Sequence, residues 1–174
     1  MRVRRYFGFV DLCGFTRFTE AHGDEEAVAK LIGFRALVRE VASEHGVRVA
    51  KWLGDGAMFV STEGASLVQA LCDLERRADD AMTLPLRAGL AGGEVILFEG
   101  DDYIGSAVNL AAHLCDEAVP GEFLAEASLA DLAPDPTSVR PVGSRIMPGF
   151  VRPVPVVAIA APEPITTTHE IIAS

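Results

Sequence analysis

A tight turn at residues 54–56 joins two apolar runs, and it constrains the fold more than any other feature of the sequence. The runs, residues 47–53 and 57–61, are typical of β-strands. The dipeptide Asp55-Gly56 between them is the strongest short-range signal for a β-hairpin. Strands joined by so short a turn pair in antiparallel orientation. The chain is therefore predicted to contain an antiparallel sheet that includes this hairpin.

Hydrophobic periodicity predicts the other elements of the chain. Apolar residues recur at helical spacing in residues 24–46, 67–78 and 105–116. Strand-like runs cover residues 4–12, 86–97, 123–125, 139–146 and 151–159, and a glycine pair at 92–93 interrupts the second of these. The order strand, helix, strand, strand, helix, strand predicts an α+β fold. This is a ferredoxin-like antiparallel sheet with helices on one face and a C-terminal β extension.

The first strand-like run is apolar on both of its faces. Phe7 and Phe9 would lie on one face of the strand, and Tyr6 and Val10 on the other. A central strand that is covered on both sides has this pattern. With the helices on one face, the second cover is expected to be a partner subunit or a ligand.

Composition limits the classes of function that the chain can have. Its 174 residues suit one domain over residues 1–160, followed by residues 161–174 as a flexible tail with prolines and a threonine run. The formal net charge of −10 excludes a general nucleic-acid binder, which needs a basic face. No apolar run reaches the roughly 20 residues that cross a membrane. The three scattered cysteines indicate buried thiols in the reducing cytoplasm.

Two aspartates stand where a strand-like run meets a glycine-containing turn. Asp11 closes the first strand-like run, and Asp55 lies in the hairpin turn. A carboxylate at a strand end, next to backbone that can approach closely, suits a hard cation held against a phosphate. Either aspartate alone is more often a turn or capping residue. The two together predict one metal site built from two neighbouring strands.

Three segments carry a resemblance to a known family. They read FVDLCGFT at residues 9–16, KWLGDG at residues 51–56 and GSAVNLAA at residues 105–112. In this order and spacing they resemble the class III nucleotidyl cyclase catalytic domain, over nearly the whole chain. Members of that family convert a nucleoside triphosphate into a 3′,5′-cyclic monophosphate and pyrophosphate.

The resemblance implies a role for each of these residues. Asp11 and Asp55 would bind two divalent metal ions, Mg²⁺ or Mn²⁺, and the carbonyl of Leu12 would add a ligand. The backbone amides at a helix start would hold the phosphates. These amides belong to Cys13, Gly14, Phe15 and Thr16.

The resemblance also implies the choice of base and the handling of the ribose. Lys51 would donate to adenine N1 and Asp102 would accept from the 6-amino group, which makes the pair adenylyl-like and the substrate ATP. Asn109 would orient the ribose. His113 lies four residues further along, on the same helix face. Outside the family context, Lys51 and Asp102 are equally well explained as solvated charges.

Two positions depart from the family pattern. His113 stands where the family usually has an arginine that stabilises charge in the transition state. Pro148 stands where a lysine usually grips the triphosphate. Arg145 and Arg152 are near enough in sequence to replace that lysine, although a solvated strand face is the favoured interpretation of both. The family's active site forms between two domains, so a single chain carrying both residue sets implies a homodimer.

Three hypotheses about function follow from these residues. The first is an adenylate cyclase whose activity is weak or depends on pH. The second is a degenerate cyclase-like dimer that binds nucleotide for regulation, with little turnover. The third is a different enzyme on the same scaffold, such as a diguanylate cyclase or a polymerase-type palm, and the segment around Asn109 argues against it. The first is favoured modestly over the second.

Overall fold

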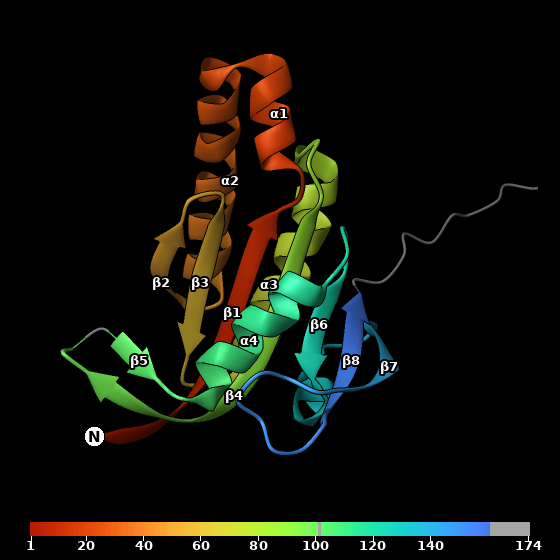
Figure 1. The fold of residues 1–174 in the computed structure, drawn as a ribbon. Helices are drawn as coiled ribbons and strands as arrows, with labels where there is room; N and C mark the ends of the chain where they lie inside the picture. The colour runs from red at the N-terminus through yellow and green to blue at the C-terminus, as the bar shows by residue number, and fades with distance from the viewer. Residues whose placement is uncertain (101, 161–174) are drawn as a thin grey trace, which may run out of the picture.

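The computed structural model describes residues 1–100 and 102–160, which form one sheet with helices on both faces (Figure 1). The strands are β1 Arg2–Leu12, β2 Arg48–Leu53, β3 Gly56–Ser61, β4 Leu86–Phe98, β5 Asp102–Ile104, β6 Phe123–Glu126, β7 Ser138–Arg145 and β8 Val154–Ala160. The helices are α1 Phe15–His22, α2 Asp24–Glu44, α3 Gly64–Ala81 and α4 Ser106–Glu117, with a short 3₁₀ helix, η1, at Ala127–Leu132. The predicted tail, residues 161–174, lies outside the described residues.

The sheet has the predicted ferredoxin-like order at its centre. Across the described residues it has eight strands in the order β2-β3-β1-β4-β6-β8-β7, with β5 paired to β4. The first four of these pair antiparallel, whereas β6 runs parallel to β4 and begins the C-terminal β extension. The α+β fold class is confirmed. The hairpin predicted from Asp55-Gly56 is the β2–β3 hairpin.

One expectation about the layers was wrong, because the helices lie on both faces of the sheet. The helices α2 and α3 pack behind it, and α4 crosses in front of it (Figure 1). Phe7 of β1 is fully buried against Leu110 and Leu114 of α4. Since α4 has an apolar stripe of its own, burying that stripe on the sheet is favourable. The second cover of β1 is therefore a helix of the same chain.

Glycines allow two close approaches within this arrangement. A Cβ atom at Gly89 would lie 2.2 Å from the carbonyl oxygen of Ala111, so its absence lets α4 lie directly on β4. A Cβ atom at Gly92 would lie 2.5 Å from the ring of Tyr6. The expected interruption at the glycine pair 92–93 was wrong, because β4 continues through it and stays paired with β1. Gly92 is instead a position where the Tyr6 ring occupies the space that a side chain would need.

Two other features bear on the sequence expectations. Cys72 and Cys115 are buried as expected, whereas Cys13 is only half-buried. None of the helices in residues 1–100 and 102–160 combines the length and the apolar character needed to cross a membrane.

Candidate active site

The β-ladder brings Asp11 and Asp55 to the same end of the sheet. Asp11 pairs with Gly56 across β1 and β3, and the backbone N–H of Leu12 donates to the carbonyl oxygen of Asp55 at 3.1 Å. Gly54, at φ 70°, supplies the left-handed conformation that turns the chain from β2 into β3. The carboxylate of Asp55, in the β2–β3 turn, therefore lies close enough to that of Asp11, at the end of β1, for the two charges to interact.

The electrostatics of this pair favour a positively charged guest. Partial burial, followed by the negative charge of Asp11, raises the pKa of Asp55 above its ordinary value. Burial also raises the pKa of the neighbouring Cys13 thiol, and the positive charge of Arg87 opposes this rise. Two carboxylates forced together in a half-buried site are stabilised by a cation, and their oxygens are the ligands that Mg²⁺ and Mn²⁺ prefer.

Arg87 belongs to this site, although the sequence expectations did not include it. It lies directly opposite Asp11 in the β1–β4 ladder, and its Nη2 donates to Oδ2 of Asp11 at 2.9 Å. Its Nη1 donates to the backbone carbonyl of Asp116 at 3.0 Å, which ties the guanidinium to the end of α4. One sequence feature could have identified Arg87 as a site residue, because it is the single charged residue in the otherwise apolar run at residues 86–91.

The loop after β1 forms the floor of a pocket. Gly14, at φ 77°, lies just before α1, whose first turn leaves the amides of Phe15 and Thr16 without intrahelical partners. The amide of Cys13 differs from the expectation, because it donates to the carbonyl oxygen of Pro85 at 2.8 Å and is already used. The pocket has a volume of about 360 Å³ and is lined by Asp11, Leu12, Cys13, Gly14, Phe15, Thr16, Asp55, Arg87, Ala118 and Pro120.

Lys51 and Asp102 form an ion pair with each other, away from this pocket. The Nζ atom of Lys51 on β2 contacts Oδ1 of Asp102 on β5, and both side chains remain about half exposed. Tyr103 helps to fix β5, because its ring packs edge-on against Phe7 with centroids 5.3 Å apart. The hydroxyl of Tyr103 also accepts from Arg48 at 3.1 Å. The structure thus brings together the two residues assigned to base recognition.

Asn109 and His113 lie on the side of α4 that faces away from the sheet. Asn109 is exposed and His113 is half-buried, whereas the apolar residues of α4 face the sheet. Neither residue lines the pocket that contains the two carboxylates. The chain therefore presents the predicted site residues as two separate sets, one in the pocket and one outside it.

The two arginines considered near Pro148 differ in their surroundings. Arg145 is ion-paired with Glu117 at 3.3 Å and also donates to the backbone carbonyl of Val142 at 2.9 Å. Arg152 is exposed beside the turn that contains Pro148. Neither of them lines the carboxylate pocket.

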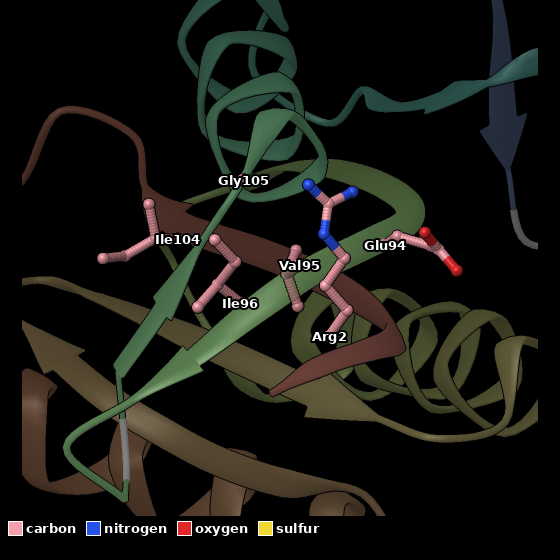
Figure 2. Close-up of a pocket in the computed structure, with 6 residues that line it drawn as sticks. All are labelled: Arg2, Glu94, Val95, Ile96, Ile104 and Gly105. Carbon is pink, nitrogen blue, oxygen red and sulfur yellow. The ribbon is translucent and has the colours of Figure 1, made fainter.

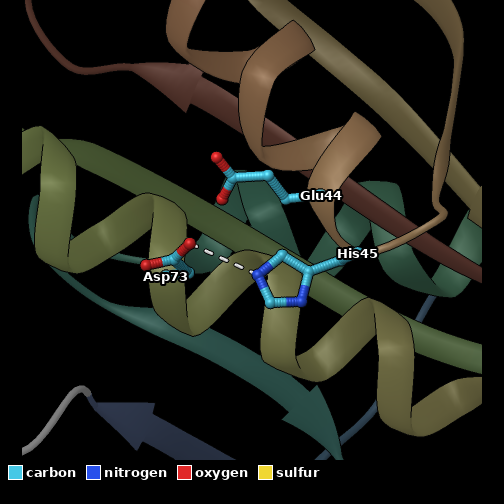
Figure 3. Close-up of side chains that lie close together, drawn as sticks. All are labelled: Glu44, His45 and Asp73. Carbon is cyan, nitrogen blue, oxygen red and sulfur yellow. Dashed lines mark hydrogen bonds and ion pairs between the residues drawn. The ribbon is translucent and has the colours of Figure 1, made fainter.

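A second cluster of possible metal ligands is already neutralised. Glu44 and His45, at the C-terminal end of α2, lie beside Asp73 in the middle of α3 (Figure 3). Asp73 accepts from Arg76 at 2.6 Å and from Arg77 at 2.9 Å, and Arg77 also pairs with Glu44. Burial alone would raise the pKa of Asp73, but hydrogen bonds from Arg76, His45 and Arg77 lower it. Two arginines at this position make it a poor cation site.

Another pocket lies where the start of β1 meets the β4–β5 hairpin (Figure 2). Its volume is about 180 Å³, and Arg2 and Glu94 lie toward one end while Ile104 lies at the other. The remaining walls are largely apolar. It lacks the paired carboxylates that distinguish the pocket at Asp11.

Comparisons with known proteins show which sequences and which fold the chain resembles. The sequence matches no protein-family profile. An uncharacterized protein of Mycobacterium tuberculosis is 40% identical over 148 residues, which are 84% of this chain and 39% of that protein. A protein named adenylate cyclase from Streptomyces coelicolor is 32% identical over 125 residues, which are 71% of this chain and 32% of that protein. The chain thus spans less than half the length of these curated relatives.

Among solved structures, the adenylyl cyclase CyaB from Pseudomonas aeruginosa superposes with a TM-score of 0.82. The match covers 93% of this chain and 96% of that chain, at 23% sequence identity. At this level of identity the likeness shows the fold. The chain has the fold of adenylyl cyclase domains.

Proposed function

We propose that residues 1–160 form an adenylate cyclase domain that converts ATP into 3′,5′-cyclic AMP and pyrophosphate. The observation that carries this proposal is the placement of Asp11 and Asp55 in one pocket with Arg87 and the first turn of α1. Phosphate-transfer chemistry needs such a combination of carboxylates, a cation and free amides. The relatives named adenylate cyclase and the shared fold support the same activity.

The donor set of the pocket fits divalent metal ions. Asp11 and Asp55 would hold them, with the backbone of Leu12 as a further oxygen donor. When bound, two such ions lower the barrier by activating the ribose 3′-hydroxyl and by neutralising charge on the leaving pyrophosphate.

The protein's own cations and amides would bind the triphosphate. Arg87 lies at the pocket wall, where its guanidinium donates to Asp11 and to the carbonyl of Asp116. Its remaining N–H groups and its permanent charge would bind phosphate oxygens. The amides of Gly14, Phe15 and Thr16 lie at the positive end of the α1 dipole. Together they would orient the triphosphate while the carboxylates hold the cations.

The second residue set would recognise the nucleoside. Lys51 and Asp102 hold each other in place through their ion pair, so a donor and an acceptor are presented side by side. That polarity matches N1 and the 6-amino group of adenine, whereas guanine has the opposite polarity at these atoms. Asn109 would orient the ribose, and His113 would supply positive charge to the transition state when protonated.

A homodimer is proposed because the two sets lie apart in one chain. Lys51, Asp102, Asn109 and His113 do not line the pocket that contains Asp11 and Asp55. A two-fold symmetric dimer would bring the nucleoside set of one subunit to the carboxylate pocket of the other, and it would do so twice. Lys51 and Asp55 would then serve opposite sites, although they are four residues apart.

A nucleotide-binding domain without turnover is the second candidate function. Its support is that neither Arg145 nor Arg152 lines the carboxylate pocket, so neither stands in there for the two cations that the family usually has at positions 113 and 148. Arg145 is already paired with Glu117. A domain of this kind would bind ATP and metal in the same pocket and release no cyclic product.

An assay of the purified protein separates these functions. The protein would be incubated with ATP or GTP and with Mg²⁺ or Mn²⁺, and the products identified by mass spectrometry. Cyclic AMP from ATP that disappears in Asp11→Ala supports the adenylate cyclase. Calorimetric binding of ATP without any cyclic product supports the second candidate. Cyclic GMP as the main product would overturn the assignment of the base.

A further inference from the structure

Arg35 of α2 reaches across to the turn that carries Asp55. Its Nη2 atom donates to the carbonyl oxygen of Gly54 at 3.2 Å, and its guanidinium lies 5.0 Å from the centroid of the Trp52 ring. The carbonyl of Gly54 belongs to the peptide group whose nitrogen is the backbone nitrogen of Asp55. A hydrogen bond to this carbonyl therefore fixes the orientation of the peptide that precedes the Asp55 side chain.

The turn has a matching anchor on its other side. The carbonyl oxygen of Asp55 itself accepts from the N–H of Leu12 at 3.1 Å. The chain at Asp55 is thus held by β1 on one side and by α2 on the other. Leu53, at the start of the same turn, is 45% exposed, so apolar packing contributes little to its order.

We propose that Arg35 is a positioning residue that sets the Asp55 carboxylate for divalent metal binding by clamping the Gly54–Asp55 peptide. This inference rests on the proposed function, because it assigns Asp55 to the metal site. Arg35 acts through the backbone and touches neither metal nor substrate. Groups that hold a metal ligand in place commonly change metal affinity by about 10–100-fold when they are removed.

Packing against the Trp52 ring does not by itself explain why position 35 holds an arginine. Arg39, one helical turn further along α2, also lies 5.0 Å from the Trp52 ring centroid. In the part of the chain that the structure describes, Arg39 makes this ring contact without a hydrogen bond to the turn. The Nε atom of Arg35 is buried without a hydrogen-bond partner, which costs free energy. An apolar side chain would cover the ring without that cost.

These facts define a matched pair of variants. Arg35→Met keeps the bulk over Trp52, removes the donor to Gly54 and removes the unpartnered Nε. Arg39→Met makes the same chemical change at the residue that only contacts the ring. Arg35→Lys keeps a charged donor, so it tests rescue and remains informative if the methionine variant folds poorly. Thermal melts in EDTA report the stability of each variant.

Metal binding is measured without reference to activity. Trp52 is the only tryptophan of the chain, so quenching of its fluorescence by Mn²⁺ reports binding at the adjacent turn. The electron paramagnetic resonance signal of free Mn²⁺ counts the bound ion independently. We expect Arg35→Met to retain the wild-type Tm in EDTA and to bind Mn²⁺ about tenfold more weakly. Arg39→Met should bind as the wild type does, and Arg35→Lys should fall between.

Three results would overturn the inference in distinguishable ways. If the wild type binds Mn²⁺ and Arg35→Met binds it equally well, Arg35 does not position Asp55 and the proposed function is untouched. If the wild type itself binds no Mn²⁺, the metal site fails, and the proposed function and this inference fail with it. Equal weakening in Arg35→Met and Arg39→Met would show that ring coverage alone matters, which also overturns the inference.

Discussion

Arg87 on β4 lies directly across from Asp11 on β1, and its guanidinium donates two hydrogen bonds to a single carboxylate oxygen, at 2.9 and 3.2 Å. The hydrogen bond with Asp11 raises the pKa of Arg87, although partial burial opposes the rise, so the arginine stays charged. One strand pairing thus places a permanent cation beside the two proposed metal-binding carboxylates.

Replacing Arg87 should weaken the binding of ATP. A hydrogen bond to a charged group contributes about 1.5–3 kcal/mol, so Arg87→Ala should raise the Kd for ATP roughly 10–100-fold. Arg87→Lys should recover only part of the loss, because a lysine keeps the charge without the fork. Calorimetry with a non-hydrolysable ATP analogue measures both. Arg76→Gln is the control, since Arg76 pairs with Asp73 outside the pocket. Wild-type affinity in Arg87→Ala would contradict a phosphate role.

Removing the charge of Asp55 should stabilise the protein when no metal is bound. The pKa of Asp55 is raised above 3.8, first by burial and then by the charge of Asp11. Its contribution to stability is therefore fully present below pH 3.8 and is lost as the pH rises through the raised pKa. At pH 7.5 in EDTA, Asp55→Asn should raise the Tm by roughly 1–2 °C, a small figure because the site is largely solvated.

The same variant should lose the response to metal. Saturating Mn²⁺ should raise the Tm of the wild type by mass action, and the Tm of Asp55→Asn should barely move. The gain of Asp55→Asn in EDTA should shrink as the pH is lowered toward 3.8. Asp131→Asn is a suitable control, because that side chain is exposed and does not line the pocket. A lower Tm for Asp55→Asn in EDTA would show that the carboxylate is already compensated.

The sequence predicts well those helices and strands whose formation depends on residues within or next to them. The β2–β3 hairpin follows from Asp55-Gly56, and α2 follows from the acidic first turn and the helical spacing that buries Phe34 and Val38. The juxtaposition of the two carboxylates follows from the same hairpin, because β3 pairs with β1. Local chemistry was sufficient for the hairpin and for α2, whereas the meeting of the carboxylates also needs the long-range pairing of β1 with β3.

The sequence did not predict β5, α1 or the role of Arg87, because these features are too short or depend on contacts with distant parts of the chain. The strand β5 has only three residues, and its partners, β4 and Lys51 of β2, come from elsewhere in the chain. The helix α1 has only eight residues, none of them fully buried, and is therefore shorter than the roughly 11–18 residues over which helical periodicity is recognised. The role of Arg87 depends on the register of β1 against β4, which no local pattern in β4 reveals.

Mixing two inactive variants should restore activity if the active sites form between subunits. Asp55→Ala removes a carboxylate and Lys51→Ala removes a base contact. In a heterodimer one site would carry both changes and the other would carry neither. Random 1:1 mixing makes half of the dimers heterodimers with one intact site each, so the mixture should reach about one quarter of wild-type activity.

The complementation has its own control. A mixture of Asp55→Ala with Asp11→Ala should stay inactive, because both changes fall in the same residue set. A mixture of Asp55→Ala and Lys51→Ala that also stays inactive, while native mass spectrometry shows heterodimers, would place the two sets in one subunit's site.

His113 should make the activity depend on pH. Histidine gains its positive charge between about pH 8 and 6, whereas arginine is charged throughout. If His113 supplies charge to the transition state, kcat should rise as the pH falls over this range. His113→Arg should increase kcat by about tenfold or more, since arginine contributions of this kind reach roughly 10³-fold. It should also flatten the pH profile, which steady-state assays of cyclic AMP formation can measure.

Two further variants separate this role from general effects of pH. His113→Asn should lower kcat and remove the slope between pH 8 and 6, because the amide cannot take up the proton. His22→Asn changes an exposed histidine at the end of α1 and should leave the profile as it is. Asn109, four residues before His113 on the same helix, would still orient the ribose in both. A wild-type profile that is flat, together with no gain in His113→Arg, would assign no charge role to His113 and would favour the domain without turnover.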